Sequence, residues 1–344
     1  MNPHSQNVPS ALNNTGPAET IGFAEEASTR MSGNPLFAGW YADPEIHCFN
    51  GRYYIYPTGS ASFEKQHVFE CWSSDDLTNW KHEGVILDLD DVLWSTQYAA
   101  WAPSCAQSPL DGKFYLYFSA GDGAGIGVAV SDSPAGPFRD AIGMPLVREY
   151  YFGAQPIDAH CFVDDDGQSY LLWGGHGKCV IVPLTPTMRA FHRAPREITP
   201  SKDYVEGPFM IRRNGLYYLM WSEGSWTDHS YLAAYGVAKH PLGPFQFAGK
   251  ILENHPEIAN GAGHHSVMLL PGTQDDWVIC YHRRPLDACE DHHRVVCLDR
   301  LTFRSDSSIA PVTLTNEGVP AHSAALAEPF TPGRWARGVN WKSW

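Results

Sequence analysis

The sequence lacks the features of a membrane-spanning or secreted protein. No apolar run approaches the length of about 20 residues that a helix needs to cross a bilayer. The N-terminal stretch "MNPHSQNVPSALNNTGPAET" contains neither the basic segment nor the apolar core of a secretory signal. The eight cysteines form no CxxC pair and no short-range framework, which argues against disulfides and zinc sites. We therefore expect an intracellular protein without a membrane partner, in which residues 1–32 form a polar, disordered leader; secretion of a trimmed or unconventionally exported form is the alternative.

Positive charge is also scarce. The chain has 24 Lys and Arg against 38 Asp and Glu, which gives a formal net charge of −14 at pH 7. Because no basic stripe is present to neutralise phosphates, we expect no nucleic-acid partner. Helical periodicity is rare as well, and 31 Gly and 26 Pro interrupt the chain throughout. These features favour an all-β protein and are compatible with a neutral substrate.

What the sequence does have is a repeated pattern. The stretches "FNGRYYIYPTGS", "LDGKFYLYFSAG", "DDGQSYLLWGGH" and "RNGLYYLMWSEG" each place a glycine turn before aromatic residues and alternating apolar positions. The stretch "LPGTQDDWVICYHRR" is a fifth, looser copy. The turn glycines are Gly51, Gly112, Gly167, Gly215 and Gly272. A repeat of about 50 residues with several short strands is typical of a β-propeller.

We therefore predict a single all-β domain, a five-bladed β-propeller that spans residues 33–304. A β-sandwich or a parallel β-helix fits less well, because a sandwich rarely repeats itself five times and a β-helix repeats at a shorter period. Residues 305–344 follow the fifth repeat, and we expect them to pack on the propeller or to close its last blade.

Each repeat is preceded by a short segment that should form the innermost strand of its blade, where the blades converge on one pocket. Three of these segments contain an acid, Asp43, Asp158 and Glu206, eight or nine residues before the turn glycine. Trp101 and His264 hold comparable positions in the other two segments. One acid alone could be a turn or cap residue. Three in a similar register predict carboxylates at equivalent places in three blades, facing one pocket.

Glycoside hydrolysis explains such a cluster. Carboxyl groups that are buried together raise the pKa of at least one of them, a cost that folding does not require. In hydrolysis one carboxylate activates water while another must stay protonated near neutral pH. An inverting enzyme keeps these two groups about 6.5–9.5 Å apart, which suits residues on different blades.

The ordered set "GWYADPEI", "YAAWAPSCA", "PIDAHCFVDDDGQSYLLWGG", "YVEGPFMIRRNGLYYLMWSEG" and "GAGHHSV" resembles glycoside hydrolase family 43. The resemblance implies a five-bladed propeller that hydrolyses β-D-xylosides or α-L-arabinofuranosides with inversion. It makes Asp43 the general base, Glu206 the general acid, and Asp158 the residue that tunes and orients the acid. It also implies that His264 meets a hydrated structural cation such as Ca²⁺ in the central channel, with no cofactor required for the chemistry.

Other residues are candidates for contacts with the sugar. Trp101 in "WAPS" could stack on a sugar ring. Phe63 and Trp226 lie in loops after inner strands, where they could form the walls of the pocket. Arg283 in "YHRRP" and Arg294 compete as donors to sugar hydroxyls. The segment "CEDHHR" does not have the spacing of a zinc site and is interpreted as a loop.

The sequence thus predicts an inverting exo-glycosidase that releases β-1,4-linked D-xylose from the non-reducing end of xylo-oligosaccharides, with α-L-arabinofuranosidase activity. The alternatives are an α-L-arabinofuranosidase or another furanosidase or arabinan-acting enzyme, and, with less support, a non-catalytic propeller that serves as a binding scaffold. A scaffold has no need of inward-facing acids. The exact sugar and the oligomeric state stay open.

Overall fold

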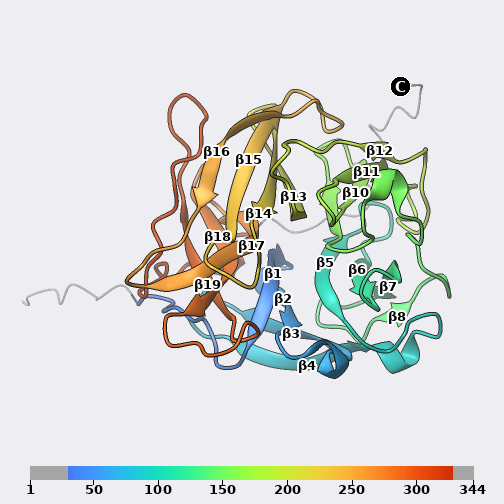
Figure 1. The fold of residues 1–344 in the computed structure, drawn as a ribbon, viewed down its shortest axis with the longest axis horizontal. Helices are drawn as coiled ribbons and strands as arrows, with labels where there is room; N and C mark the ends of the chain where they lie inside the picture. Colours follow the sequence, from blue (N-terminus) through green and yellow to red (C-terminus); the bar gives the residue numbers. More distant parts are fainter. Residues whose placement is uncertain (1–29, 328–344) are drawn as a thin grey trace, which may run out of the picture.

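Strands provide nearly all of the regular structure in residues 30–327, the part of the chain that the computed structural model describes. Five antiparallel sheets are arranged around a common axis (Figure 1). The first strand of each sheet lies innermost, since these five strands contact one another in a closed ring. The predicted all-β, five-bladed propeller is therefore confirmed.

The blades follow one another along the chain. The first contains β1 (Tyr41–Phe49), β2 (Arg52–Gly59), β3 (Val68–Ser74) and β4 (Lys81–Asp88). The second contains β5 (Trp101–Gln107), β6 (Phe114–Ala120), β7 (Gly125–Ser131) and β8 (Arg139–Asp140). The third contains β9 (His160–Val163), β10 (Ser169–Trp173), β11 (Val180–Pro183) and β12 (Arg196–Glu197).

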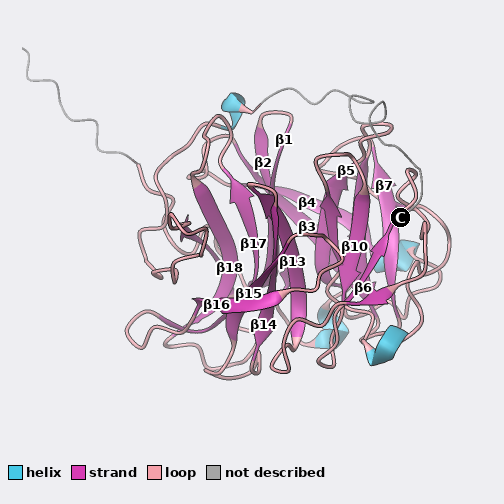
Figure 2. Cartoon of the chain, turned by 90° about the horizontal axis from the view of Figure 1, so that it is seen from above, coloured by secondary structure: helices cyan, strands magenta, loops and turns pink. Residues whose placement is uncertain are grey.

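The fourth blade contains β13 (Glu206–Arg213), β14 (Leu216–Glu223), β15 (Leu232–Ala238) and β16 (Gln246–Leu252). The fifth contains three strands, β17 (Ala259–Leu269), β18 (Trp277–Pro285) and β19 (Val295–Leu301). Four short 3₁₀ helices lie in connections, η1 (Phe63–Lys65), η2 (Leu89–Asp91), η3 (Tyr151–Gly153) and η4 (Ala324–Leu326) (Figure 2). No helix in the described residues is long and apolar enough to cross a membrane.

The hydrophobic core is divided among the junctions between blades. Five clusters of buried side chains lie between successive blades, and the last joins the fifth blade to the first. A second strand such as β6, "FYLYFSA", is buried along its whole length because another blade packs on each of its faces. This explains why the second strands show aromatic and apolar runs in the sequence, whereas the outer strand β16 begins with exposed residues.

Segments from both ends of the described chain lie beside the fifth blade. The N–H of Leu36 donates to the carbonyl of Val296 in β19 at 3.0 Å, and residues 32–34 pair with residues 316–319. Farther along, Val312 bonds to Ile251 of the fourth blade, and the N–H of Ala324 donates to Asp75 beyond β3. Residues 30–32, which the sequence analysis placed in the leader, take part in this pairing; residues 1–29 and 328–344 lie outside the described residues.

Candidate active site

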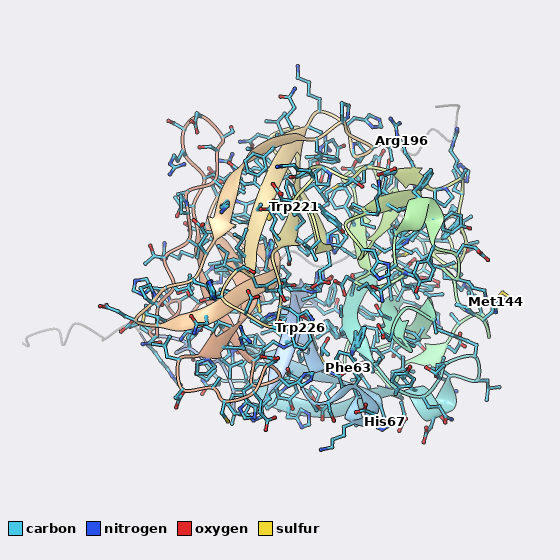
Figure 3. The ribbon with its side chains drawn as sticks, viewed as in Figure 1. Phe63, His67, Met144, Arg196, Trp221 and Trp226 are labelled. Atoms are coloured by element: carbon cyan, nitrogen blue, oxygen red, sulfur yellow. The ribbon has the colours of Figure 1, made fainter. Side chains whose placement is uncertain are left out.

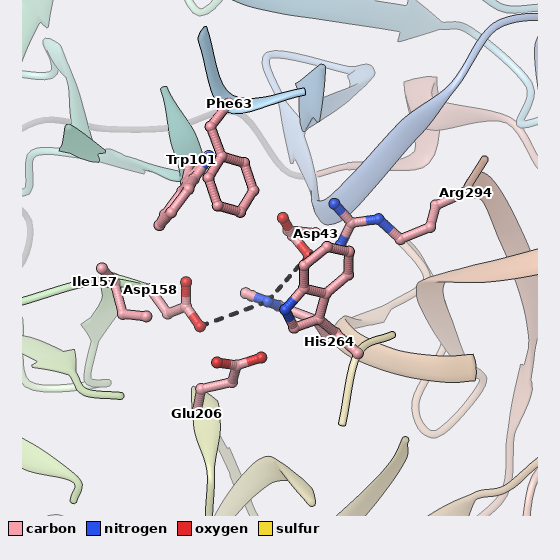
Figure 4. A pocket seen from close by; sticks show the side chains of 9 residues that line it. Asp43, Phe63, Trp101, Ile157, Asp158, Glu206, His264 and Arg294 are labelled. Carbon is pink, nitrogen blue, oxygen red and sulfur yellow. Dashed lines mark ion pairs between the residues drawn. The ribbon is translucent and has the colours of Figure 1, made fainter. Parts of the chain in front are cut away.

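A small pocket with a cavity volume of about 70 Å³ opens where the inner strands meet. Side chains from all five blades and their loops contribute to it (Figure 4). Its lining residues are Asp43, Phe63, Trp101, Ile157, Asp158, Glu206, Trp226, His264 and Arg294. The structure thus brings together eight of the nine residues that the sequence predicted for the site.

A backbone bulge places these side chains. The inner strands β1, β5, β13 and β17 each shift register near their start, and one residue there adopts a left-handed conformation. The third blade has the same feature just before β9. The left-handed residues at equivalent places in the five blades are Asp43 (φ 48°), Ala102 (φ 42°), Asp158 (φ 57°), Gly207 (φ 64°) and His264 (φ 30°); β17 contains a further one, Gly261 (φ 60°).

The three acids do not occupy equivalent positions in their blades, contrary to the prediction from the sequence. Asp43 and Asp158 are the left-handed residues of their blades, but the left-handed residue of the fourth blade is Gly207. Glu206 lies one residue earlier, at the position of Trp101 in the second blade. Counting back to the turn glycine misses this offset, because the spacing varies by a residue from blade to blade. The acids therefore approach the pocket from two different backbone positions.

Asp43 is the ionised acid of the pocket. Burial raises the pKa of its carboxyl, but the positive charges of His264 and Arg294 and a hydrogen bond from His264 outweigh this and hold the pKa well below its usual range. Nδ1 of His264 lies 3.3 Å from Oδ1 of Asp43, and Nη1 of Arg294 lies 3.5 Å from it. Asp43 is therefore a carboxylate at all ordinary pH values.

The pKa values of Asp158 and Glu206 are shifted in the opposite direction, above the usual carboxyl range. Burial raises the pKa of Asp158 to about 7, with further increases from the neighbouring charges of Glu206 and Asp43. Burial likewise raises the pKa of Glu206, although His264 and a hydrogen bond from Tyr231 reduce the effect. Two buried carboxyls that face a third, ionised one cannot both lose their protons easily, so the pair keeps a proton up to near neutral pH.

His264 is the cation among these acids. Its Nδ1 lies 3.3 Å from Asp43 and 3.7 Å from Oδ2 of Asp158 (Figure 4). Burial alone would lower its pKa, but the charges of Asp158 and Asp43 raise the pKa to about 9. His264 is thus protonated at neutral pH and offsets part of the negative charge in the pocket.

The opposite wall of the pocket is aromatic. Phe63 packs edge-on against Trp101, with ring centroids 4.8 Å apart, and lies 6.3 Å from Trp226. Phe63 and Trp226 both lie near the centre of the molecule in the face view (Figure 3). The guanidinium of Arg294 covers the ring of Trp226 at 4.9 Å and donates from Nε to Oγ of Ser60 at 3.0 Å. Arg294 is therefore fixed beside both Asp43 and the aromatic wall.

Arg283 is the one predicted site residue that the structure places elsewhere. Successive side chains of a strand point to opposite faces, and in β18 it is His282, next to Arg283, that faces Asp43. Arg283 instead donates from Nη1 to the carbonyl of Thr315 at 2.8 Å and from Nη2 to Oδ1 of Asn316 at 2.7 Å. Its role is to hold the segment after the fifth blade.

Four residues near the pocket were missed from the sequence. Ile157 lines the pocket directly, and His292 packs between Phe63 and Trp226. Tyr231 bonds to Glu206, and Nδ1 of His282 lies 3.3 Å from Oδ1 of Asp43. His282 could have been found from the sequence, because it stands in "YHRR", which aligns with the second strands of the other blades. No sequence pattern marks Tyr231, an isolated tyrosine before β15.

The residues of the central channel do not form a metal site with several protein ligands. No group of three or more His, Cys, Asp or Glu side chains within residues 30–327 is placed to hold a metal ion. Glu45, the channel carboxylate beneath the pocket, is already engaged by Oγ of Ser104 at 2.9 Å, Nε2 of His47 at 2.5 Å and Nδ1 of His160 at 3.3 Å. A hydrated cation near His264 stays a proposal, and no chemical step is assigned to it.

Comparison with known proteins identifies the family. Residues 32–309 match the model of glycosyl hydrolases family 43. The chain belongs to this family. It is 44% identical to a β-D-galactofuranosidase of Aspergillus niger, over 86% of this chain and 89% of that protein. It is 32% identical to xylosidase/arabinosidase 43A of Humicola insolens, over 80% of this chain and 98% of that protein.

A solved family 43 structure has the same architecture. An arabinoxylan arabinofuranohydrolase from Bacillus subtilis, determined in complex with cellotetraose, superposes with a TM-score of 0.75 at 27% identity. The match covers 86% of this chain and 72% of that one. The protein is therefore a family 43 glycoside hydrolase, and the named activities of its relatives differ in the sugar.

Proposed function

We propose that the protein is an inverting exo-glycosidase that removes one terminal sugar at a time. The observation that carries this proposal is that one pocket holds an ionised carboxyl beside a pair of carboxyls that keeps a proton up to near neutral pH. Asp43 has a pKa well below its usual range, whereas the pKa values of Asp158 and Glu206 are raised. Hydrolysis of one glycosidic bond by a base and an acid requires one ionised and one protonated carboxyl on the two sides of that bond.

The charges make Asp43 the base, and the resemblance to family 43 makes Glu206, of the two remaining acids, the proton donor. Asp43 removes a proton from a water molecule, whose oxygen then bonds to the anomeric carbon. Glu206 gives its proton to the glycosidic oxygen as the bond from that oxygen to the anomeric carbon breaks, so the leaving group departs as an alcohol. Asp158 accepts the N–H of Gly207 through Oδ2 at 3.1 Å and thereby fixes the backbone beside Glu206. The proton on Asp43 and the missing proton on Glu206 are exchanged with solvent after each turnover.

The lining of the pocket suits exo-action. Phe63, Trp101 and Trp226 line one small pocket at the propeller axis together with the three acids, and a terminal sugar ring can enter it. The aromatic wall can pack on the apolar face of a ring, and Arg294 can donate to its hydroxyls.

We place terminal furanosides first among the substrates, and β-D-galactofuranosides before α-L-arabinofuranosides. The support is the 44% identity to a β-D-galactofuranosidase, against 32% to a xylosidase/arabinosidase. The two furanosides have the same configuration at each ring carbon and differ only in the exocyclic chain, so one pocket can accept both. Release of β-1,4-linked D-xylose, the expectation from the sequence, is the second candidate, supported by the xylosidase/arabinosidase relative.

Release of 4-nitrophenol tests the proposal. The wild type and Asp43→Asn are compared on the β-D-galactofuranoside, the α-L-arabinofuranoside and the β-D-xylopyranoside. We expect the galactofuranoside to have the highest kcat/KM, and the variant to lose about 10²–10⁴-fold on it. Highest turnover of the xyloside would support the second candidate. Wild-type turnover of none of the three, or equal turnover by the variant, would refute the proposal.

A further inference from the structure

A recurring contact links each blade to the next beside the pocket. The backbone N–H of a left-handed residue on an inner strand donates to a hydroxyl on the second strand of the preceding blade. Oγ1 of Thr58 accepts from Ala102 at 2.7 Å, Oγ of Ser119 from Asp158 at 3.0 Å, and Oγ of Ser222 from His264 at 3.1 Å. We call these contacts the interblade latches.

The fifth junction has the same latch with a different side chain. The N–H of Asp43 donates to Nδ1 of His282, on β18, at 3.1 Å. His282 pairs across its sheet with Gly263, the residue before the left-handed His264. In the first blade Thr58 likewise pairs with the residue before Asp43, so the latch residues occupy one equivalent position in each blade.

In the third blade a different residue provides the acceptor. Its equivalent position is Gly174, which bonds to Ile157, the residue before Asp158. A Cβ on Gly174 would lie 1.9 Å from the carbonyl oxygen of Lys178, so no side chain can fill this position. The N–H of Gly207 in the next blade is nevertheless satisfied, because it donates to Oδ2 of Asp158. All five left-handed N–H groups therefore have a side-chain acceptor from the preceding blade.

We propose that His282 is a positioning residue for Asp43, the general base of the proposed function on which this inference rests. A non-glycine residue with positive φ is strained, and it persists only where its surroundings hold it. At Asp43 the Nδ1 bond supplies this restraint, and it fixes the direction in which the carboxylate leaves the strand.

The surroundings of His282 suit this role. The ring is fully buried, and burial lowers its pKa to about 4, so at neutral pH Nδ1 is free to accept the N–H of Asp43. Its ring lies parallel to that of Tyr231, at 5.7 Å and 11°. Tyr231 in turn bonds to Glu206. One stacked pair thus supports the base through one ring and the acid through the other.

Three variants separate positioning from simple stability. His282→Asn keeps an oxygen acceptor close to the place of Nδ1, whereas His282→Ala removes it. Thr58→Ala is the matched control, since it removes the same latch from Ala102, which carries no reacting group. Steady-state kinetics are measured on two galactofuranosides, one with a good and one with a poor leaving group, alongside the melting temperature.

We expect His282→Ala to lower kcat about 10–100-fold with KM within about threefold, because a small displacement of a reacting group costs this much. The loss should be the same for both leaving groups, since the base acts on water. His282→Asn should recover at least tenfold of this loss. Thr58→Ala should lower the melting temperature similarly while changing kcat less than about twofold.

A wild-type kcat in His282→Ala would overturn the inference, as would equal losses in His282→Ala and His282→Asn. A crystal structure of His282→Ala provides a test that does not depend on the substrate. We expect Asp43 to leave the left-handed region or its carboxylate to move; an unchanged Asp43 would refute the positioning role. Failure of the wild type on all glycosides would count against the proposed function instead, and the structure of the variant would still decide the role of His282.

Discussion

The hydroxyl of Tyr231 donates a hydrogen bond to Oε1 of Glu206 at 3.0 Å. Tyr231 is fully buried, and burial together with the charge of Glu206 raises its pKa well above the usual value, so it stays a neutral donor. The bond favours the ionised form of Glu206 and lowers its pKa within an environment that otherwise raises it. One phenol therefore both orients the proposed acid and adjusts its proton affinity.

Removing this hydroxyl should move the alkaline limb of the pH profile. In Tyr231→Phe the carboxyl of Glu206 loses a bond to its ionised form, so its pKa rises and the protonated acid persists to higher pH. We expect the alkaline limb of kcat/KM to shift upward and the acid limb to stay in place. The measurement is the pH dependence of kcat/KM for both proteins. A downward shift would show that the bond does not act on the proton donor.

The wild-type pH profile should be asymmetric. The alkaline limb should fall near pH 7, because the Asp158–Glu206 pair loses its proton as the pH rises through the raised pKa of about 7. The acid limb should lie below the usual carboxyl range, because Asp43 stays ionised until well below it. Initial rates from pH 9 down to the lowest pH at which the protein stays folded check both limbs. Full activity at pH 9 would contradict the assignment of a protonated acid to this pair.

Base and acid variants should respond differently to the leaving group. Glu206→Gln should retain most activity on aryl glycosides with acidic phenols, which need little protonation, and lose about 10²–10⁴-fold on alkyl glycosides. Asp43→Asn should lose activity on both classes alike. Plots of log kcat/KM against leaving-group pKa distinguish the two. If Asp158→Asn, and not Glu206→Gln, showed the leaving-group dependence, Asp158 would be the proton donor.

Arg294 should act on Asp43 through its charge. The guanidinium lies 3.5 Å from Oδ1 of Asp43 and contributes to its low pKa. Arg294→Gln should therefore raise the pKa of Asp43 and move the acid limb of kcat/KM to higher pH. KM should also rise because the side chain lines the pocket. An acid limb that does not move would show that His264 alone keeps Asp43 ionised.

Arg283 provides the matched contrast to Arg294. Because its guanidinium bonds to Thr315 and Asn316, away from the pocket, Arg283→Gln should lower the free energy of unfolding by about 1–3 kcal/mol. Its kcat/KM should stay within about twofold of the wild type. Urea unfolding and kinetics on one preparation measure both quantities. A large loss of activity with normal stability would place Arg283 in the site after all.

The sequence predicted the blades because each second strand is buried on both faces and follows a turn that ends in a glycine, so the pattern repeats. It also predicted the acids, since inner strands converge on the axis. The one-residue offset of Glu206 could not be predicted, because a bulge changes the direction of a side chain while the number of residues between the acid and the turn glycine stays similar. His282 escaped notice because its contact with Asp43 crosses between blades, and Tyr231 because its contact with Glu206 joins residues that lie 25 positions apart in the fourth blade.

The choice between Arg283 and Arg294 was also beyond the sequence. Arg283 follows the apolar stretch "VICY" and Arg294 precedes the apolar stretch "VVCL", so either could reach the axis. Strand alternation turns Arg283 toward the segment after the blade, while the loop that ends at β19 returns Arg294 to Asp43. The path of that loop depends on contacts of His292 with Phe63 and Trp226, residues that are distant in sequence.

The stereochemistry of the first product tests the central claim most directly. In the proposed mechanism Asp43 delivers water to the face opposite the leaving group, so the sugar is released with inverted configuration. Proton NMR in the first minutes of hydrolysis of the preferred furanoside should show the opposite anomer before mutarotation, and added methanol should yield no methyl glycoside. First formation of the retained anomer, or of a methyl glycoside, would show a covalent intermediate and contradict the assignment of Asp43 as a base.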